Sequence, residues 1–158
     1  MSSFDRRTFL IAASALAGCG FEPVYAPGTG GGDLRGRIEV LPPADEEGFA
    51  LVNRLEQRLG EPAAPEYLLI ADIGITEESV GFLPDGSISR FNVLGRVTWR
   101  LSQGDETVIT GNERSFTSYS ATSTTVATIV ARRDARRRLM VILADQITAT
   151  ILSRSEEL

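Results

Sequence analysis

The sequence contains no histidine and no lysine, and it has a single cysteine, Cys19. The absence of histidine removes the commonest general base and the commonest metal ligand. One cysteine cannot form a disulfide within the chain. If the Cys19 sulfur also carries a covalent modification, such as a lipid, the chain has no free thiol for catalysis or for binding a metal. A hydrolase would have to work with carboxylates, hydroxyls and arginines alone. We therefore expect a protein that is not an enzyme and that holds no metal and no cofactor.

The chain also lacks an apolar run of the roughly 20 residues that a helix needs to cross a bilayer. Its longest apolar run, residues 10–18, is much shorter and follows the charged pair Arg6-Arg7. A charged start followed by a short apolar run is typical of a removable export signal. We expect residues 1–18 to be this signal.

The end of the apolar run carries a lipidation pattern. It is Leu16-Ala17-Gly18-Cys19, an aliphatic residue and two small residues directly before a cysteine, as in a bacterial lipobox. The pattern predicts cleavage between Gly18 and Cys19, a diacylglycerol on the Cys19 sulfur, and acylation of the new amino terminus with a palmitate-type chain. The alternative is an ordinary signal peptide that happens to contain a cysteine.

The charged start resembles the twin-arginine export signal, in which two arginines and one variable residue precede Phe and Leu. Here the stretch is Arg6-Arg7-Thr8-Phe9-Leu10. Asp5 stands where that signal usually has Ser or Thr, and Ile11 replaces a frequent lysine. A generic positively charged signal start therefore remains open.

Removing residues 1–18 leaves 140 of the 158 residues, with 14 arginines against 20 acids and a net charge of −6. This length suits one domain with one core. Hydrophobic content of 42% and charged content of 23% are close to globular averages. The acidic balance argues against broad binding to nucleic acid or to anionic membrane surfaces. We expect residues 19–33, which include glycines 30–32, to be a flexible linker, and residues 34–158 to be one domain.

The periodicity of this domain predicts a strand at 34–41, a helix at 45–59, strands near 67–76, 90–101 and 106–119, and a helix at about 123–153. Residue 111 is a glycine and a candidate β-bulge in the fourth strand. Two apolar stripes accompany the helices. The first consists of Phe49, Val52, Leu55 and Leu59; the second consists of Val126, Ile129, Val130, Met140, Leu143, Ile147 and Ile151. The order predicts an α+β two-layer sandwich, with a four-stranded, mostly antiparallel sheet covered on one face by two helices.

The third strand has the clearest alternation in the chain. Arg90, Arg96 and Arg100 fall on its polar face with no acid beside them in the strand. Guanidinium groups can fork onto phosphate oxygens, so these residues are candidates for binding phosphate groups. The alternative is a solvated face paired with acids from neighbouring strands. A second group, Arg132, Arg133, Arg136, Arg137 and Arg138 with Asp134, is more simply the exposed side of an amphipathic helix.

Two stretches resemble one family. Cys-Gly-Phe-x-Pro-Val-Tyr at residues 19–25 resembles the mature start of the LptE family, the lipopolysaccharide-assembly lipoproteins of the Gram-negative outer membrane. Residues 131–152 resemble that family's closing helix. The resemblance implies a non-enzymatic lipoprotein on the periplasmic side of the outer membrane. It would plug a large β-barrel translocon, support the barrel's assembly and contact lipopolysaccharide. In such a protein, Arg90, Arg96 and Arg100 are our candidates for contact with lipopolysaccharide or with the lumen of the barrel.

Two other function classes stay open. The first is a lipoprotein scaffold of another periplasmic complex. The second is a lipid-anchored hydrolase that uses carboxylates. Adjacent acids such as Glu46-Glu47 and Glu77-Glu78 point apart in a helix or strand, so they do not build an acid–base pair. We therefore predict no catalytic centre.

Overall fold

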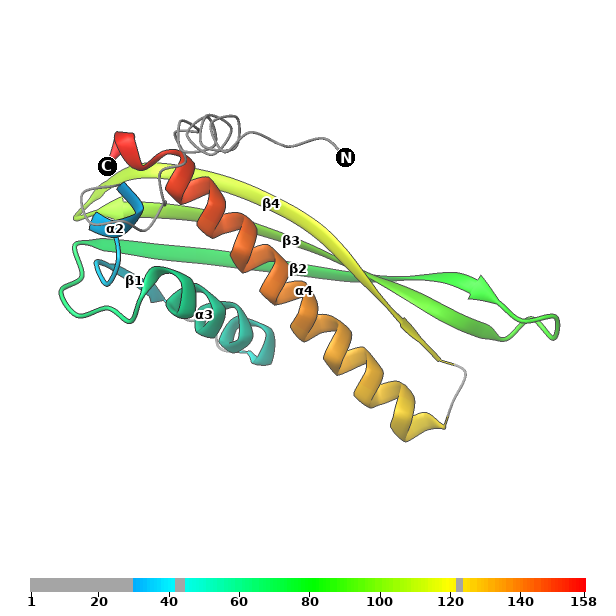
Figure 1. The fold of residues 1–158 in the computed structure, drawn as a ribbon. Helices are drawn as coiled ribbons and strands as arrows, with labels where there is room; N and C mark the ends of the chain where they lie inside the picture. The colour runs from blue at the N-terminus through cyan, green and yellow to red at the C-terminus, as the bar shows by residue number, and fades with distance from the viewer. Residues whose placement is uncertain (1–29, 42–44, 122–123) are drawn as a thin grey trace, which may run out of the picture.

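The computed structural model describes residues 30–41, 45–121 and 124–158 (Figure 1). The predicted export signal and the lipidation site at Cys19 lie outside the described residues. The elements, in chain order, are α2 (Gly30–Asp33), β1 (Ile38–Leu41), α3 (Glu46–Leu59), β2 (Tyr67–Phe82), β3 (Ile88–Gln103), β4 (Glu106–Ser120), α4 (Thr125–Ser153) and the 3-10 turn η1 (Ser155–Glu157). No helix of the described ranges is long and apolar enough to cross a membrane.

The four strands form one sheet in the order β1-β2-β3-β4. β1 is parallel to β2, and the other neighbours are antiparallel. α4 packs on β3 and β4, while α3 packs on β1 and on α4. The predicted α+β sandwich, with a mostly antiparallel four-stranded sheet and two helices against it, is confirmed.

The strands differ in length from the prediction. β2 and β3 have 16 residues each, so each extends about 50 Å. The extra length of β2 comes from continued pairing with β3 out to the hairpin at residues 83–87. The predicted first strand is shorter than expected. β1 begins only at Ile38, because Leu34 is buried in the turn that follows the single helical turn of α2.

α3 begins and ends where its sequence predicts. The Asp45 side chain accepts a hydrogen bond from the backbone N–H of Gly48, and Gly60 ends the helix with φ 88°. The prediction that Phe49 faces the core is wrong, because its side chain is 71% exposed. Leu51 is buried instead. The buried stripe passes through Gly48, so that Phe49 lies on the flank of the helix.

α4 covers the sheet over only part of its length. Met140, Leu143, Ile147 and Ile151 are buried as predicted, and Ala135 is the first buried residue along the helix. The prediction that the stripe begins at residue 126 is wrong, because three of its members are exposed: Val126, Ile129 and Val130. Figure 1 shows the first turns of α4 diverging from the strands. A straight helix can follow a twisted sheet for only part of its length.

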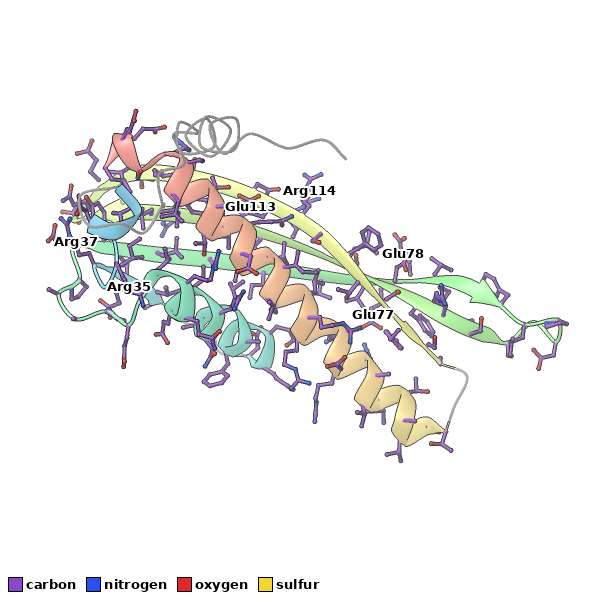
Figure 2. The ribbon with its side chains drawn as sticks, viewed as in Figure 1. Arg35, Arg37, Glu77, Glu78, Glu113 and Arg114 are labelled. Carbon is purple, nitrogen blue, oxygen red and sulfur yellow. The ribbon has the colours of Figure 1, made fainter. Side chains whose placement is uncertain are left out.

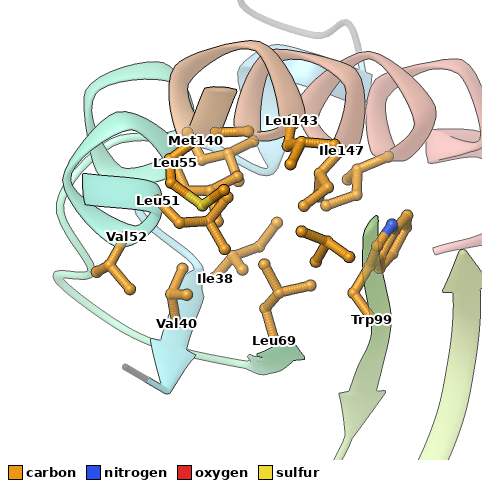
Figure 3. Close-up of a cluster of buried hydrophobic side chains, with 14 of the residues drawn as sticks. Ile38, Val40, Leu51, Val52, Leu55, Leu69, Trp99, Met140, Leu143 and Ile147 are labelled. Carbon is orange, nitrogen blue, oxygen red and sulfur yellow. The ribbon is translucent and has the colours of Figure 1, made fainter. Parts of the chain in front are cut away.

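The core lies between this helix and the inner face of the sheet (Figure 3). Met140, Leu143 and Ile147 of α4 point toward Leu69 and Trp99 of the central strands. On the α3 side, a second set of buried side chains closes the core: Ile38, Val40, Leu51, Val52 and Leu55.

Gly111 has a packing role, and the prediction of a bulge there is wrong. The register of β3 with β4 is continuous at Gly111, and its one shift falls between Leu101 and Ser102. Gly111 lies opposite Trp99, and a Cβ added to it would stand 2.4 Å from the indole ring. The indole of Trp99 therefore occupies the space that a side chain at Gly111 would fill.

We expect Gly111→Ala to lower the free energy of unfolding by about 1–3 kcal/mol, because the added methyl group overpacks the indole. Gly74→Ala is the matched control, since its Cβ would meet nothing closer than 3.9 Å. That variant should stay within about 0.5 kcal/mol of the parent. Urea denaturation of both variants measures the difference. Equal stability of the two would show that Trp99 does not need the space.

Candidate interaction surface

The face of the sheet opposite the helices carries the predicted arginines. Arg90, Arg96 and Arg100 are exposed; Arg96 and Arg100 alternate with buried residues of β3, and Arg90 lies between two half-buried ones. The described helices pack against the other face, so the structure places all three side chains on the open face of the sheet. The alternation predicted for β3 is confirmed.

The three arginines form a line rather than a pocket. Strand geometry separates Arg96 from Arg100 by about 13 Å and from Arg90 by about 20 Å. A single phosphate cannot contact all three. The arrangement suits an extended or repeated anionic surface.

Arg114 of β4 enlarges this line. It lies directly opposite Arg96 in the register of the two strands, and its Nε donates to Asn112 Oδ1 at 3.2 Å. Two like charges opposite each other in a sheet are unfavourable without an anion nearby. Sequence reasoning missed Arg114, although its place among alternating polar residues of β4 was a usable signal.

Acids of the neighbouring strand lie close to this line but do not pair with it. By register, Asp72 and Glu78 of β2 are opposite Thr98 and Asn92 of β3, diagonal to the arginines. Within residues 30–41, 45–121 and 124–158, no salt bridge joins any acid to Arg90, Arg96 or Arg100. The open face therefore presents guanidinium groups that have no ionic partner in the described chain.

The arginines of α4 are different, since every one of the five pairs with an acid. Two of them, Arg137 and Arg138, pair with Asp134 on the same helix. Arg133 pairs with Glu46 at 3.3 Å, while Arg132 and Arg136 reach Glu77 of β2. Four of the five side chains are exposed, as the simpler interpretation predicted, whereas Arg136 is partly buried. The ion pairs themselves were not predicted.

Glu77 is the centre of a polar network between the sheet and both long helices. Its Oε1 accepts from Arg132 Nε and Arg136 Nη2, each at 2.8 Å, and its Oε2 accepts from the Tyr119 hydroxyl at 3.1 Å. Arg136 Nη1 also donates to Glu47 Oε1 of α3 at 2.9 Å. The side chain of Glu77 is only 17% exposed. The network ties β2, β4, α3 and α4 together, and no local sequence signal predicted it.

The network changes the pKa values of Glu77 and Tyr119. Burial alone would raise the pKa of Glu77, but hydrogen bonds from Arg132, Arg136 and Tyr119 outweigh it and lower the pKa. Burial and the bond to Glu77 raise the pKa of the Tyr119 hydroxyl. Glu77 is thus held as a carboxylate.

The neighbouring acid Glu78 points the other way. Figure 2 shows Glu77 near α4 and Glu78 on the far side of the strands, as alternation along a strand requires. Glu113 and Arg114 separate in the same way, and Glu113 Oε1 accepts from Thr150 of α4 at 2.9 Å. In the part of the chain that the structure describes, no three acids or cysteines gather as a metal site would need.

A groove of about 600 Å³ runs between α3 and the first half of α4. Phe49 and Ile129 contribute exposed apolar surface to its lining. The ion pairs of Arg133 with Glu46 and of Arg136 with Glu47 cross it. Its charged groups are therefore largely satisfied within the domain.

Comparison with known proteins identifies the family. The family model described as "LptE: Lipopolysaccharide-assembly" matches residues 36–151. No curated protein matches the chain in sequence.

Three solved structures share the fold. A lipoprotein from Caulobacter crescentus CB15 has 20% identity and a TM-score of 0.67, covering 80% of this chain and 96% of its own. Rare lipoprotein B from Shewanella oneidensis has 11% identity and a TM-score of 0.59, with coverage of 75% and 94%. A minor lipoprotein from Acinetobacter baumannii has 17% identity and a TM-score of 0.54, with coverage of 74% and 89%. At these identities the likeness concerns the fold alone.

We expect Glu77→Gln to lower the free energy of unfolding by about 1.5–3 kcal/mol at pH 7, because charge-assisted hydrogen bonds are lost. Since folding lowers the pKa of Glu77 below its ordinary value of 4.5, its contribution is complete above that value. The contribution disappears as the pH falls through the folded pKa. The parent should therefore lose stability more steeply than the variant as the pH falls below 4.5.

Glu78→Gln is the matched control, because it removes the same charge from the adjacent, exposed position. It should keep the acid dependence of the parent. Denaturation at a series of pH values measures all three proteins. Parallel curves for the parent and Glu77→Gln would contradict the assigned role of the network.

Proposed function

The chain belongs to the LptE lipopolysaccharide-assembly family, and on that premise we propose that it partners and plugs the β-barrel lipopolysaccharide translocon of the outer membrane. In this role it supports assembly of the barrel and insertion of lipopolysaccharide. The observation that carries the proposal is the open sheet face, where Arg90, Arg96 and Arg100 have no ionic partner among the described residues. The protein acts by binding, without catalysis and without a cofactor.

The lipid anchor belongs to this proposal. Arg6 and Arg7 begin the export signal, for which the twin-arginine route is preferred, and cleavage falls between Gly18 and Cys19. A lipid on Cys19 holds the domain at the periplasmic side of the outer membrane. Residues 19–33 act as the linker, the last four of them forming the single turn of α2.

The open face has the chemistry that a plug needs. The lumen of an outer-membrane barrel is polar, so a domain inside it has to present polar groups outward. Arginine forks bind phosphate oxygens in pairs, which suits the phosphates of lipid A. A line of arginines more than 30 Å long meets an extended anionic surface better than one small ion.

A lipid-anchored scaffold of another envelope complex is the alternative. It shares the anchor and the fold but requires no barrel partner. The two functions therefore differ in what the protein binds.

Affinity purification of the lipidated protein from detergent-solubilised outer membranes tests the proposal. We expect a large β-barrel protein to co-purify in nearly equal amount. The intact mass should show loss of residues 1–18 and addition of acyl chains at Cys19. Recovery of the protein alone, or with a soluble periplasmic protein, would favour the scaffold, and an unmodified Cys19 would contradict the anchor.

The arginine line has its own test. We expect the triple variant Arg90→Ala, Arg96→Ala, Arg100→Ala to bind lipopolysaccharide at least tenfold more weakly at low salt, because charge pairs on an exposed face are screened by added ions. The difference from the parent should shrink as salt is raised. Titration of purified lipopolysaccharide at several salt concentrations measures it.

The matched control replaces the same three residues by lysine. Lysine keeps the charge but cannot donate two parallel hydrogen bonds to a phosphate. The lipopolysaccharide affinity of the lysine variant should therefore lie between the affinities of the parent and of the alanine variant. All three side chains are exposed, and unfolding midpoints should stay close to that of the parent. Unchanged lipopolysaccharide binding by the alanine variant would contradict a role of the three arginines in binding it.

A further inference from the structure

The outer edge of β4 is long, and no strand of the described residues lies beside it. β4 is the last strand of the sheet and has 15 residues (Figure 1). Proteins usually protect such edges with proline, lysine, a bulge or a short strand. β4 contains neither proline nor lysine, and its one register shift lies near its beginning, at the pair of Leu101 with Ile109.

The direction of the backbone groups along this edge follows from two hydrogen bonds. Arg154 Nη1 donates to the carbonyl oxygen of Thr110 at 3.3 Å, and Arg138 Nη2 donates to that of Ser118 at 3.2 Å. Both carbonyls therefore point away from β3. In an antiparallel pair, the N–H and C=O of one residue point to the same side, and successive residues alternate.

The register is continuous from Thr110 to Ser118, so the alternation carries through. Asn112, Arg114 and Phe116 direct their N–H and C=O groups outward, like the two ends. Within the described residues, no hydrogen bond reaches the backbone of these three from outside the sheet. Arg138 and Arg154 thus bond to the two ends of this edge. We call the five residues between these ends, 112–116, the window.

We propose that residues 112–116 of β4 form a strand-addition site for an extended segment of the barrel partner. This inference rests on the proposed function, and it names the means by which the two proteins join. Strand addition supplies main-chain hydrogen bonds to an exposed sheet edge, while flanking side chains select the sequence. The segment is a loop or a terminus, because strands of a closed barrel have no free edge.

Side chains around the window define the chemistry of the segment. On the open face, Arg114 lies beside Arg96 with no acid between them, so a carboxylate opposite Arg114 would relieve the repulsion. Phe116 is 64% exposed on the same face and would take an apolar neighbour. The partner segment therefore carries Asp or Glu and, two residues away, an apolar side chain.

On the side of the window that faces α4, the added strand needs small side chains. There Glu113 is bonded to Thr150, and the Thr117 hydroxyl donates to the carbonyl of Ala135 at 2.9 Å. α4 lies over this side, so large side chains of an added strand would meet the helix. Arg138 and Arg154 are exposed enough to swing aside where a longer segment pairs.

Residue-resolved amide exchange tests the inference, with the co-purified complex compared to the free protein. We expect the amides of Asn112, Arg114 and Phe116 to exchange at least tenfold more slowly in the complex. The amides of Glu113 and Ser115 already bond to β3 and should change much less. Alternate protection of this kind marks an added strand, whereas a protein lying on the open face would not select every second amide.

Two variants separate the contribution of the Arg114 backbone amide to barrel binding from that of its side chain. Arg114→Ala removes the guanidinium and keeps the amide, while Arg114→Pro removes both. Arg114→Pro removes no backbone hydrogen bond of the described free chain, but the fixed φ of proline, about −65°, is strained in an antiparallel strand. The unfolding midpoints of both variants are therefore measured first, and recovery is compared at a temperature where both are folded. We expect Arg114→Pro to recover at least fivefold less barrel than Arg114→Ala does. Equal recovery would overturn the inference, and if the proline variant fails to fold, amide exchange of the parent decides alone.

The outcomes distinguish this inference from the proposed function. A barrel that co-purifies without slowing the three amides would overturn strand addition and leave the proposed function standing. Absence of any barrel would overturn both. Slow exchange at the three amides in the purified protein by itself, with the mass of a dimer, would assign the edge to a second copy and overturn the barrel segment as its occupant.

Discussion

Close contact between α4 and the inner face of the sheet determines how the rest of this domain is arranged. A Cβ added at Gly95 would stand 2.8 Å from Leu139 and 2.9 Å from Leu143, so the helix can approach β3 this closely only because that side chain is absent. Side chains alternate along a strand. Once the inner face is packed, the opposite face has to carry the remaining residues of β3, among them Arg90 and Arg96.

The same contact divides the arginines into two classes. Apolar burial on α4 begins at Ala135, and there Arg136 joins Glu77 of β2 to Glu47 of α3. These charges hold helix and strands together where the apolar stripe ends, and they are internally matched. Arginines of the open face have no such match in the described chain. A protein with a net charge of −5 thereby presents a line of positive charge on one side.

The open face and the edge of β4 are adjacent, which joins the two proposals. Arg114 belongs to both, since its side chain lies opposite Arg96 while its backbone groups point away from β3. A partner that adds a strand at this edge would extend the sheet and place its own side chains beside the arginine line. The chain's family is described by lipopolysaccharide assembly, and such a partner would be a protein of that process.

Periodicity along the chain was enough to determine the α+β class, the order of strands and helices, the cap of α3 at Asp45, and the exposed line of arginines in β3, because local geometry alone sets the spacing of side chains. It could not determine where burial stops, since Val126 and Phe49 are as apolar as the residues that pack. Nor could it find the Glu77 network, the role of Gly111 or the free edge of β4. The network joins residues 42 to 89 positions apart, which meet only when both helices lie on the sheet. The role of Gly111 and the free edge depend on the register and order of the strands, which local spacing does not set.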